Sequence, residues 1–151
     1  MARKRLQSCP GFEEDRMMKI DGSCHCGAIS YQAEIDPARV RICHCTDCQT
    51  LSGSAFRIVA PTPESNFRLL SGVPKIYVKT AASGAKRAQA FCADCGTQIY
   101  ATSVGDGPKT IGIRTGTVRQ RAELVPRRQF WHRSALPWLA QIKCLETFDT
   151  E

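Results

Sequence analysis

The sequence predicts a small all-β domain. Across its 151 residues, short segments that alternate apolar with polar side chains recur, as expected for strands with one buried face. Glycine and proline separate these segments at short intervals, which is typical of turns between neighbouring strands. Residues 45–51 are expected to form one helical turn, and no other segment is predicted to be helical. Since domains commonly hold about 100–150 residues, we expect a single domain.

The expected strands follow one another from residue 19 to residue 115. Regular structure is predicted to begin at residues 19–22, and residues 28–35 form a second strand that Asp36 and Pro37 break. A further strand at residues 54–60 is expected to end at Pro61 and Pro63, since proline lacks a backbone donor. The remaining predicted strands are residues 40–43, 67–72, 75–79, 86–91, 98–102 and 110–115.

The chain is expected to divide into a tail, a domain and a second tail. Residues 1–17 are charged and lack periodicity, so we expect a disordered tail, and Met18 is an alternative start of translation. Residues 18–142 form the expected domain, and residues 143–151 form a C-terminal tail. The basic start of the chain is not followed by an apolar core, and no segment approaches the ~20 apolar residues of a membrane span. We therefore expect a cytoplasmic protein with no membrane partner.

The formal net charge of +7 raises the question of a nucleic-acid partner. The first part of the densest basic cluster has no interleaved aromatic residues, which a base-stacking surface would contain. A solvated basic face is therefore the favoured interpretation, and nucleic acid is not the expected partner. A site that attracts small anionic molecules fits the same charge. The cluster consists of Arg114, Arg119, Arg121, Arg127, Arg128 and Arg133.

Nine cysteines are present, and seven of them fall into three close clusters. An odd count, short spacings and the lack of an export signal favour shared metal ions over disulfides. Cys9 and Cys144 have no neighbouring cysteine and are left out of the metal sites. The seven expected ligands are Cys24 and Cys26, then Cys43, Cys45 and Cys48, then Cys92 and Cys95.

The spacing divides these seven cysteines into four and three. Cys92 and Cys95, followed by Gly96, form a zinc-knuckle hook that needs a second pair of ligands. Cys24 and Cys26 are the natural partners, because residues two apart in a strand point to the same side. We call these four the cysteine quartet and expect a closed structural zinc site. By the same alternation, His25 and His44 are expected to point away from the metal.

The remaining three, which we call the cysteine triplet, are Cys43, Cys45 and Cys48. Three thiolates would leave one position of a zinc ion open, as in catalytic sites. In the alternative, a fourth protein ligand closes the position and the site is structural. The candidates for that fourth ligand are His44, His132, Asp47 and Cys144.

The order of these motifs resembles the glutathione-dependent formaldehyde-activating enzyme family, which also contains centromere protein V. The likeness covers residues 18–142 and rests on three stretches, residues 22–28, 43–56 and 91–97, with a closing segment that includes Trp131 and Trp138. It implies a β-tent fold of antiparallel sheets stapled by zinc, with short helical turns. It also implies that the quartet holds a structural zinc ion and the triplet a catalytic one.

The resemblance further implies an activity, namely the formation of S-(hydroxymethyl)glutathione from glutathione and formaldehyde by a carbon–sulfur lyase. The expected partner is thus a small-molecule thiol such as glutathione. Because glutathione is anionic, basic residues should lie near the site, and Arg57, Arg127 and Arg128 are the candidates. Two other hypotheses stay open: a non-enzymatic zinc-ribbon-like module that contacts nucleic acid or an acidic protein through its arginine cluster, and an iron–sulfur protein.

Overall fold

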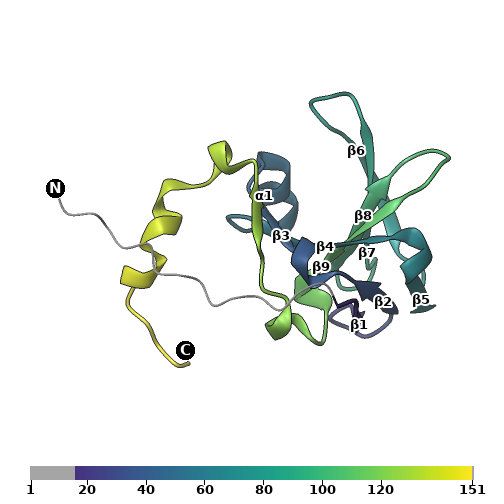
Figure 1. Cartoon of the computed structure of the whole chain (residues 1–151), viewed down its shortest axis with the longest axis horizontal. Coiled ribbons are helices and arrows are strands. Elements are labelled where there is room, and N and C mark those ends of the chain that lie inside the picture. The colour runs from purple at the N-terminus through teal and green to yellow at the C-terminus, as the bar shows by residue number, and fades with distance from the viewer. Residues whose placement is uncertain (1–15, 151) are drawn as a thin grey trace.

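Two β-sheets make up the fold, as seen in a computed structural model that describes residues 16–150 (Figure 1). Nearly all of the predicted N-terminal tail, and Cys9, lie outside the described residues. The smaller sheet has the order β1-β2-β5, and the larger one has the order β10-β3-β4-β9-β8-β7-β6. The prediction of an all-β domain is confirmed.

The elements of the smaller sheet and the helices have the following bounds. The strands are β1 (Met18–Ser23), β2 (Ser30–Ile35) and β5 (Phe67–Ser71). The α-helix is α1 (Thr46–Ser52), at the predicted place. Short helical turns were expected, although not at these positions: the 3-10 helices are η1 (Pro37–Arg39), η2 (Glu64–Asn66), η3 (Thr115–Thr117), η4 (Arg121–Glu123), η5 (His132–Ser134) and η6 (Pro137–Cys144).

The larger sheet contains seven strands, and each predicted strand of this region is present within a few residues. They are β3 (Arg41–Cys43), β4 (Arg57–Pro63), β6 (Lys75–Thr80), β7 (Lys86–Phe91), β8 (Gln98–Ser103), β9 (Thr110–Arg114) and β10 (Arg128–Phe130). Within the described part of the chain, the named strands pair antiparallel, except that β10 runs parallel to β3. The short strand β10 was not predicted.

Strand β4 corrects one expectation, because it continues through both prolines that were expected to end it. Pro61 and Pro63 pair with β9, whereas β3 pairs with β4 only from Arg57 to Val59. The prolines therefore lie beyond the start of β3, where the ladder on that side needs no amide donor. Proline is tolerated here because one edge of the strand is locally unpaired.

The core lies between the two sheets. In β2 the side chains of Tyr31, Ala33 and Ile35 are buried while the intervening ones are exposed. The ring of Phe67, on β5, lies 5.3 Å from that of Tyr31 and 5.1 Å from that of Tyr100 on β8. Phe67 thus joins the smaller sheet to the larger one.

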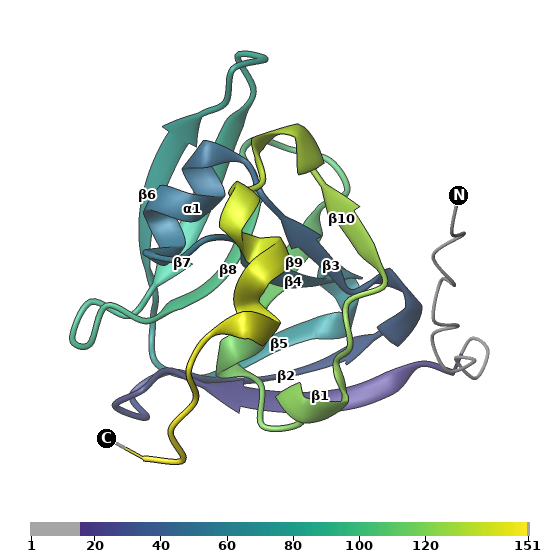
Figure 2. The ribbon, with the colours of Figure 1, turned by 90° about the vertical axis from the view of Figure 1, so that its left-hand side faces the viewer.

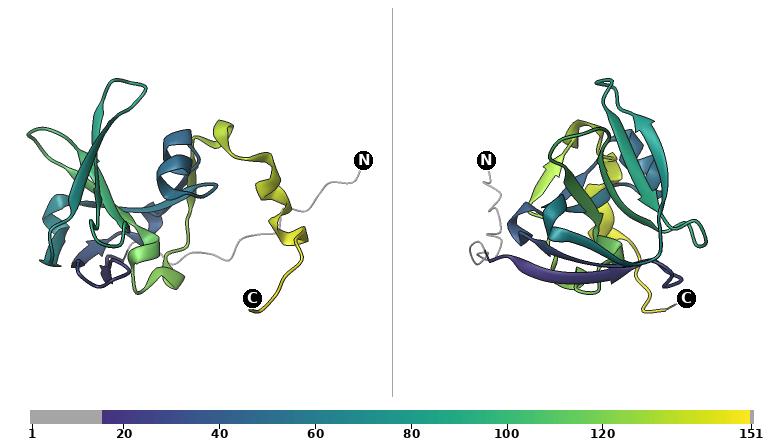
Figure 3. Two further views of the ribbon diagram at one scale, coloured as in Figure 1. Left: turned by 180° about the vertical axis from the view of Figure 1, so that it is seen from behind. Right: turned by 90° about the vertical axis from the view of Figure 1, so that its right-hand side faces the viewer.

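Helix α1 lies between the sheets and the C-terminal segment (Figures 1 and 2). The amide of Gln49 in α1 donates to the carbonyl of Ser134 at 3.0 Å, which attaches this segment to the helix. On the other side of the molecule, the β6–β7 and β8–β9 hairpins project beyond the rest of the sheet (Figure 3). Within residues 16–150, no helix is both long enough and apolar enough to cross a membrane.

Candidate metal centres

The structure brings the four sulfurs of the cysteine quartet together. All four Sγ atoms lie within 4.8 Å of one another. The Sγ atom of Cys26 lies 3.5 Å from that of Cys24 and 3.7 Å from that of Cys92. Four thiolates bound tetrahedrally to zinc at about 2.3 Å would lie about 3.8 Å apart. The quartet therefore has the spacing and the donor chemistry of a closed zinc site.

The first half of the quartet is formed by a turn, not by strand alternation as the sequence argument assumed. Strand β1 ends at Ser23, and the amide of Gly27 closes the turn by donating to the carbonyl of Cys24 at 3.1 Å. Gly27 adopts a φ of 81°, which favours glycine. The amide of Ile29 then donates to the sulfur of Cys24 at 3.3 Å. The two sulfurs meet because the chain folds back on itself. His25, between them, is exposed, as expected.

The second half follows β7, and Thr97 connects it to the first. The hydroxyl of Thr97 lies 3.2 Å from the sulfur of Cys95 and accepts from the amide of His25 at 3.1 Å. This hydroxyl, followed by backbone hydrogen bonds, lowers the pKa of Cys95 to about 5. Thr97 thus connects the two cysteine turns through its hydroxyl and favours the thiolate form of Cys95. No motif in the sequence marks this residue.

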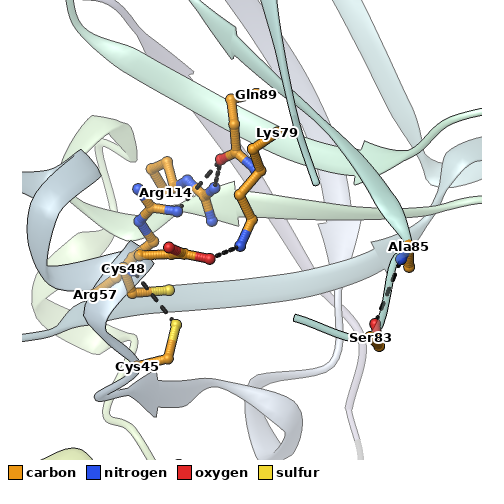
Figure 4. Close-up of polar contacts among 9 residues, drawn as sticks. Cys45, Cys48, Arg57, Lys79, Ser83, Ala85, Gln89 and Arg114 are labelled. Carbon is orange, nitrogen blue, oxygen red and sulfur yellow. Dashed lines mark hydrogen bonds and ion pairs between the residues drawn. The ribbon is translucent and has the colours of Figure 1, made fainter. Parts of the chain in front are cut away.

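The cysteine triplet is assembled where β3 runs into α1. Its three Sγ atoms also lie within 4.8 Å of one another. Cys43 ends β3, and Cys45 is the N-cap of α1, with its sulfur accepting from the amide of Cys48 at 3.3 Å (Figure 4). Cys48 is in the first turn of the helix. A strand end, a cap and a helical turn thus direct three sulfurs to one point.

The thiols of the triplet affect one another's pKa values, and these effects bear on whether the group suits a metal ion. A hydrogen bond from Cys48 is the largest effect that lowers the pKa of Cys43, to about 5, and the same contact raises the pKa of Cys48. Neighbouring thiolates repel each other, so one of them keeps its proton when no cation is near. A divalent ion that prefers sulfur removes this conflict. The donor set of the triplet therefore fits such an ion.

The four candidates for a closing ligand do not join the triplet. Among residues 16–150, no His, Asp, Glu or further Cys belongs to this group. The Nε2 atom of His44 donates instead to Oε1 of Gln129 at 2.8 Å, so this buried imidazole faces away, as expected. Asp47 forms an ion pair with Lys79. The other two candidates are His132, whose ring packs edge-on against His44, and Cys144, which is exposed.

Of the three arginines expected near the triplet, Arg57 lies there. Its side chain is buried on β4, and the burial lowers its pKa while the triplet sulfurs oppose that shift. Its Nη2 donates to Gln98 at 2.7 Å and its Nη1 to Gln89 at 3.3 Å. Arg128 is exposed on β10, and the amide of Arg127 donates to the carbonyl of Val40.

Arg114 corrects an expectation, because the sequence placed it on a solvated basic face. Its side chain is buried, and its Nη2 donates to Oε1 of Gln89 at 2.8 Å, beside Arg57 (Figure 4). Burial, followed by repulsion from Arg57, lowers the pKa of Arg114 to about 9. Neither Gln89 nor this pairing could be found in the sequence, because the residues come from three separate strands.

A cavity of about 1250 Å³ lies beside Cys24 of the quartet and the C-terminal end of α1. Its wall includes Cys24 of the quartet, Phe56 between α1 and β4, and the two buried arginines, Arg57 and Arg114. Since Arg57 also interacts electrostatically with the triplet sulfurs, the cavity lies next to the triplet. Its size is sufficient for a small organic molecule.

The fold and site define a β-sheet protein with two sulfur-rich groups, each of which could hold a metal ion. The family model of the glutathione-dependent formaldehyde-activating enzyme matches residues 19–134, and the chain belongs to this family. The resemblance inferred from the motifs is thereby confirmed.

The chain is also similar to one curated protein and to one solved structure. A protein of Schizosaccharomyces pombe named as an uncharacterized lyase is 30% identical over 84 residues, which cover 56% of this chain and 58% of that protein. The match therefore spans little more than half of that relative. A crystal structure of a Rhodobacter sphaeroides protein is 22% identical, with a TM-score of 0.57, and the match covers 72% of this chain and 98% of that one. It shares the fold.

Proposed function

We propose that this chain is a zinc-dependent carbon–sulfur lyase that acts on a thiol adduct, with glutathione and formaldehyde as the substrate pair. The observation that carries the proposal is the cysteine triplet, which has three converging sulfurs and no fourth ligand group within residues 16–150. Catalytic zinc sites keep such a position open, whereas structural sites close it. Family membership and the lyase relative support the choice of reaction.

Two zinc ions per chain follow from this proposal. The quartet would hold the structural ion and the triplet the catalytic one. A zinc ion with an open position supplies a Lewis acid that favours the thiolate form of an incoming thiol. The quartet, whose two halves lie 66 or more positions apart in the sequence, would contribute its binding energy to folding.

The residues around the triplet have separate roles in this proposal. Arg57, buried beside the sulfurs, attracts an anionic thiol and favours its deprotonated form. Lys79 holds Asp47 at the start of α1, so this carboxylate is oriented beside the site. Gln98 receives a hydrogen bond from Arg57 and donates to the carbonyl of Leu51 at 2.7 Å, which fixes the guanidinium to the end of α1. These side chains would thus position an anionic substrate beside the sulfurs that would hold the ion.

Cobalt substitution tests the open position directly. Cobalt replaces zinc in thiolate sites and makes the coordination visible by absorption. We expect millimolar glutathione to change the spectrum of the cobalt-loaded chain, and S-methylglutathione, which lacks a free thiol, to leave it unchanged. The Cys45→Ser variant should lose this response. A spectrum that does not respond to millimolar glutathione would contradict the proposal.

The reaction itself is tested by exchange spectroscopy. The zinc-loaded chain should increase the exchange rate between free and hydroxymethylated glutathione above the rate of the uncatalysed reaction, measured in parallel without the protein. Cys45→Ser should leave only the uncatalysed rate. Equal rates with and without the wild-type chain would limit its role to binding.

A further inference from the structure

Two guanidinium groups are buried side by side at the wall of the cavity. The side chains of Arg57 and Arg114 are 6% and 9% exposed. Both donate to the same atom, Oε1 of Gln89, at 3.3 Å and 2.8 Å. Within residues 16–150, neither forms an ion pair with a carboxylate. Buried charges are usually paired with an opposite charge, so this arrangement lacks a negatively charged partner.

The Nε atom of Arg114 is a second sign that the arrangement around the two arginines is incomplete. This atom is buried and has no hydrogen-bond partner within the described residues. Unsatisfied buried donors are rare because they lose hydration without replacement. Arg114 and Arg57 both line the cavity, so an acceptor that enters it can reach this pair.

The triplet does not neutralise both arginines. Its sulfurs favour both charges, those of Cys48 and Cys43 most strongly in the case of Arg114. Three thiolates around a divalent ion carry one net negative charge, whereas the two guanidinium groups carry two positive charges. Repulsion from Arg87 also lowers the pKa of Arg114, so positive charge remains for a carboxylate even when a thiolate takes the open position at the triplet.

We propose that Arg57 and Arg114 form a subsite for a carboxylate group of the ligand that occupies the cavity. A guanidinium presents paired donors that match the two oxygens of a carboxylate. Gln89 holds the two side chains together without neutralising them, since an amide oxygen carries no charge. The inference rests on the proposed function only for the identity of the ligand. It adds that the substrate is a thiol that also carries a carboxylate.

The test uses ligands without a thiol, so that it does not depend on the metal chemistry. The probes are 3-(methylthio)propionate and its neutral amide, which have the same size, titrated into the zinc-loaded chain by calorimetry. We expect the carboxylate to bind about tenfold more tightly or better. Arg114→Gln should abolish this preference, and Arg68→Gln, an exposed arginine on β5, should retain it.

Gln89→Glu separates a binding role from a structural one. The new carboxylate would occupy the gap between the two arginines, so the variant should unfold at a higher temperature and lose its preference for the carboxylate probe. If the arginines only support the fold, Gln89→Glu and Arg114→Gln would bind both probes as the wild type does, and the subsite would be refuted. This variant keeps the test valid even if Arg114→Gln fails to fold.

The remaining outcomes distinguish the subsite from the proposed function. Inorganic phosphate that binds as tightly as the carboxylate probe would overturn the carboxylate assignment. Equal binding of the acid and the amide to the wild type would refute the subsite and leave the thiol chemistry standing. A preference for the acid, together with a cobalt spectrum that glutathione does not change, would refute the proposed lyase function and support the subsite.

Discussion

Lys79, on β6, forms an ion pair with Asp47, which lies between two cysteines of the triplet in the first turn of α1. The side chain of Lys79 is 19% exposed and that of Asp47 is 50% exposed. This contact connects β6, the edge strand of the larger sheet, with the helix that Cys45 caps and that contains Cys48. The β6–β7 hairpin and the triplet are therefore connected by this ion pair.

Removing the Lys79 side chain should affect metal retention by the triplet more than it affects the stability of the fold. Because Asp47 is half exposed, we expect Lys79→Met to lower the free energy of unfolding by no more than about 1 kcal/mol. Without its tether the start of α1 should open more often, so a chromophoric chelator should remove the triplet ion about fivefold faster. Lys75→Met, an exposed lysine on the same strand, is the control. Equal release rates from all three proteins would contradict the linkage.

Metal removal should separate the two groups of cysteines. Cys45→Ser removes a triplet ligand, so the chain should fold and retain one zinc ion where the wild type holds two. Cys95→Ser removes a quartet ligand, and since structural zinc contributes on the order of 10 kcal/mol to folding, this variant should be largely unfolded. Elemental analysis and circular dichroism of the purified variants measure both effects. A single zinc ion in the wild type would disprove the division.

The sequence predicted the cysteine groups because the signal is local. Cys43, Cys45 and Cys48 lie within six positions, and Cys92 and Cys95 precede Gly96, so chain geometry alone brings these sulfurs close. Strand positions were predictable for a similar reason, because each strand carries its own alternation. The geometry of Cys24 and Cys26 was predicted for the wrong reason, since a turn, not a strand, joins them.

What the sequence could not predict depends on contacts between distant strands. Arg114 looked like one of six clustered surface arginines, and only the pairing of β9 with β4 and β8 buries it. Gln89 has no motif, and its role exists only because two arginines meet it. Strand β10 has three residues, too few for a periodic pattern, and its parallel partner β3 lies more than eighty positions away. Such features require the tertiary structure.

Close packing at Gly22 should make this position intolerant of any side chain. A Cβ atom there would lie 2.5 Å from the carbonyl oxygen of Thr117, next to the buried ring of Tyr31. We expect Gly22→Ala to lower the free energy of unfolding by about 2 kcal/mol or more, measured by urea denaturation. Gly116→Ala is the matched control, because a Cβ atom at that position meets nothing within 4 Å. Equal stabilities would contradict the packing described.

Tyr31 should make folding sensitive to alkaline pH. Its hydroxyl lies 2.6 Å from Oγ1 of Thr117, and burial raises its pKa from 10.0 to about 12. The unfolded chain therefore loses this proton near pH 10, while the folded chain keeps it until about pH 12. The resulting stabilisation is complete below pH 10 and is lost as the pH rises through 12, by about 2–3 kcal/mol.

Tyr31→Phe isolates this effect. At pH 8 the variant should be less stable than the wild type by about 1 kcal/mol, the usual net contribution of one hydrogen bond. Between pH 10 and 12 the wild type should lose stability faster than the variant, so that the difference between them shrinks and then reverses. Urea denaturation across this range measures the difference, and Tyr77→Phe, an exposed tyrosine on β6, controls for the loss of a hydroxyl. Parallel curves for the wild type and Tyr31→Phe would show that the buried hydroxyl does not govern the alkaline limit of the fold.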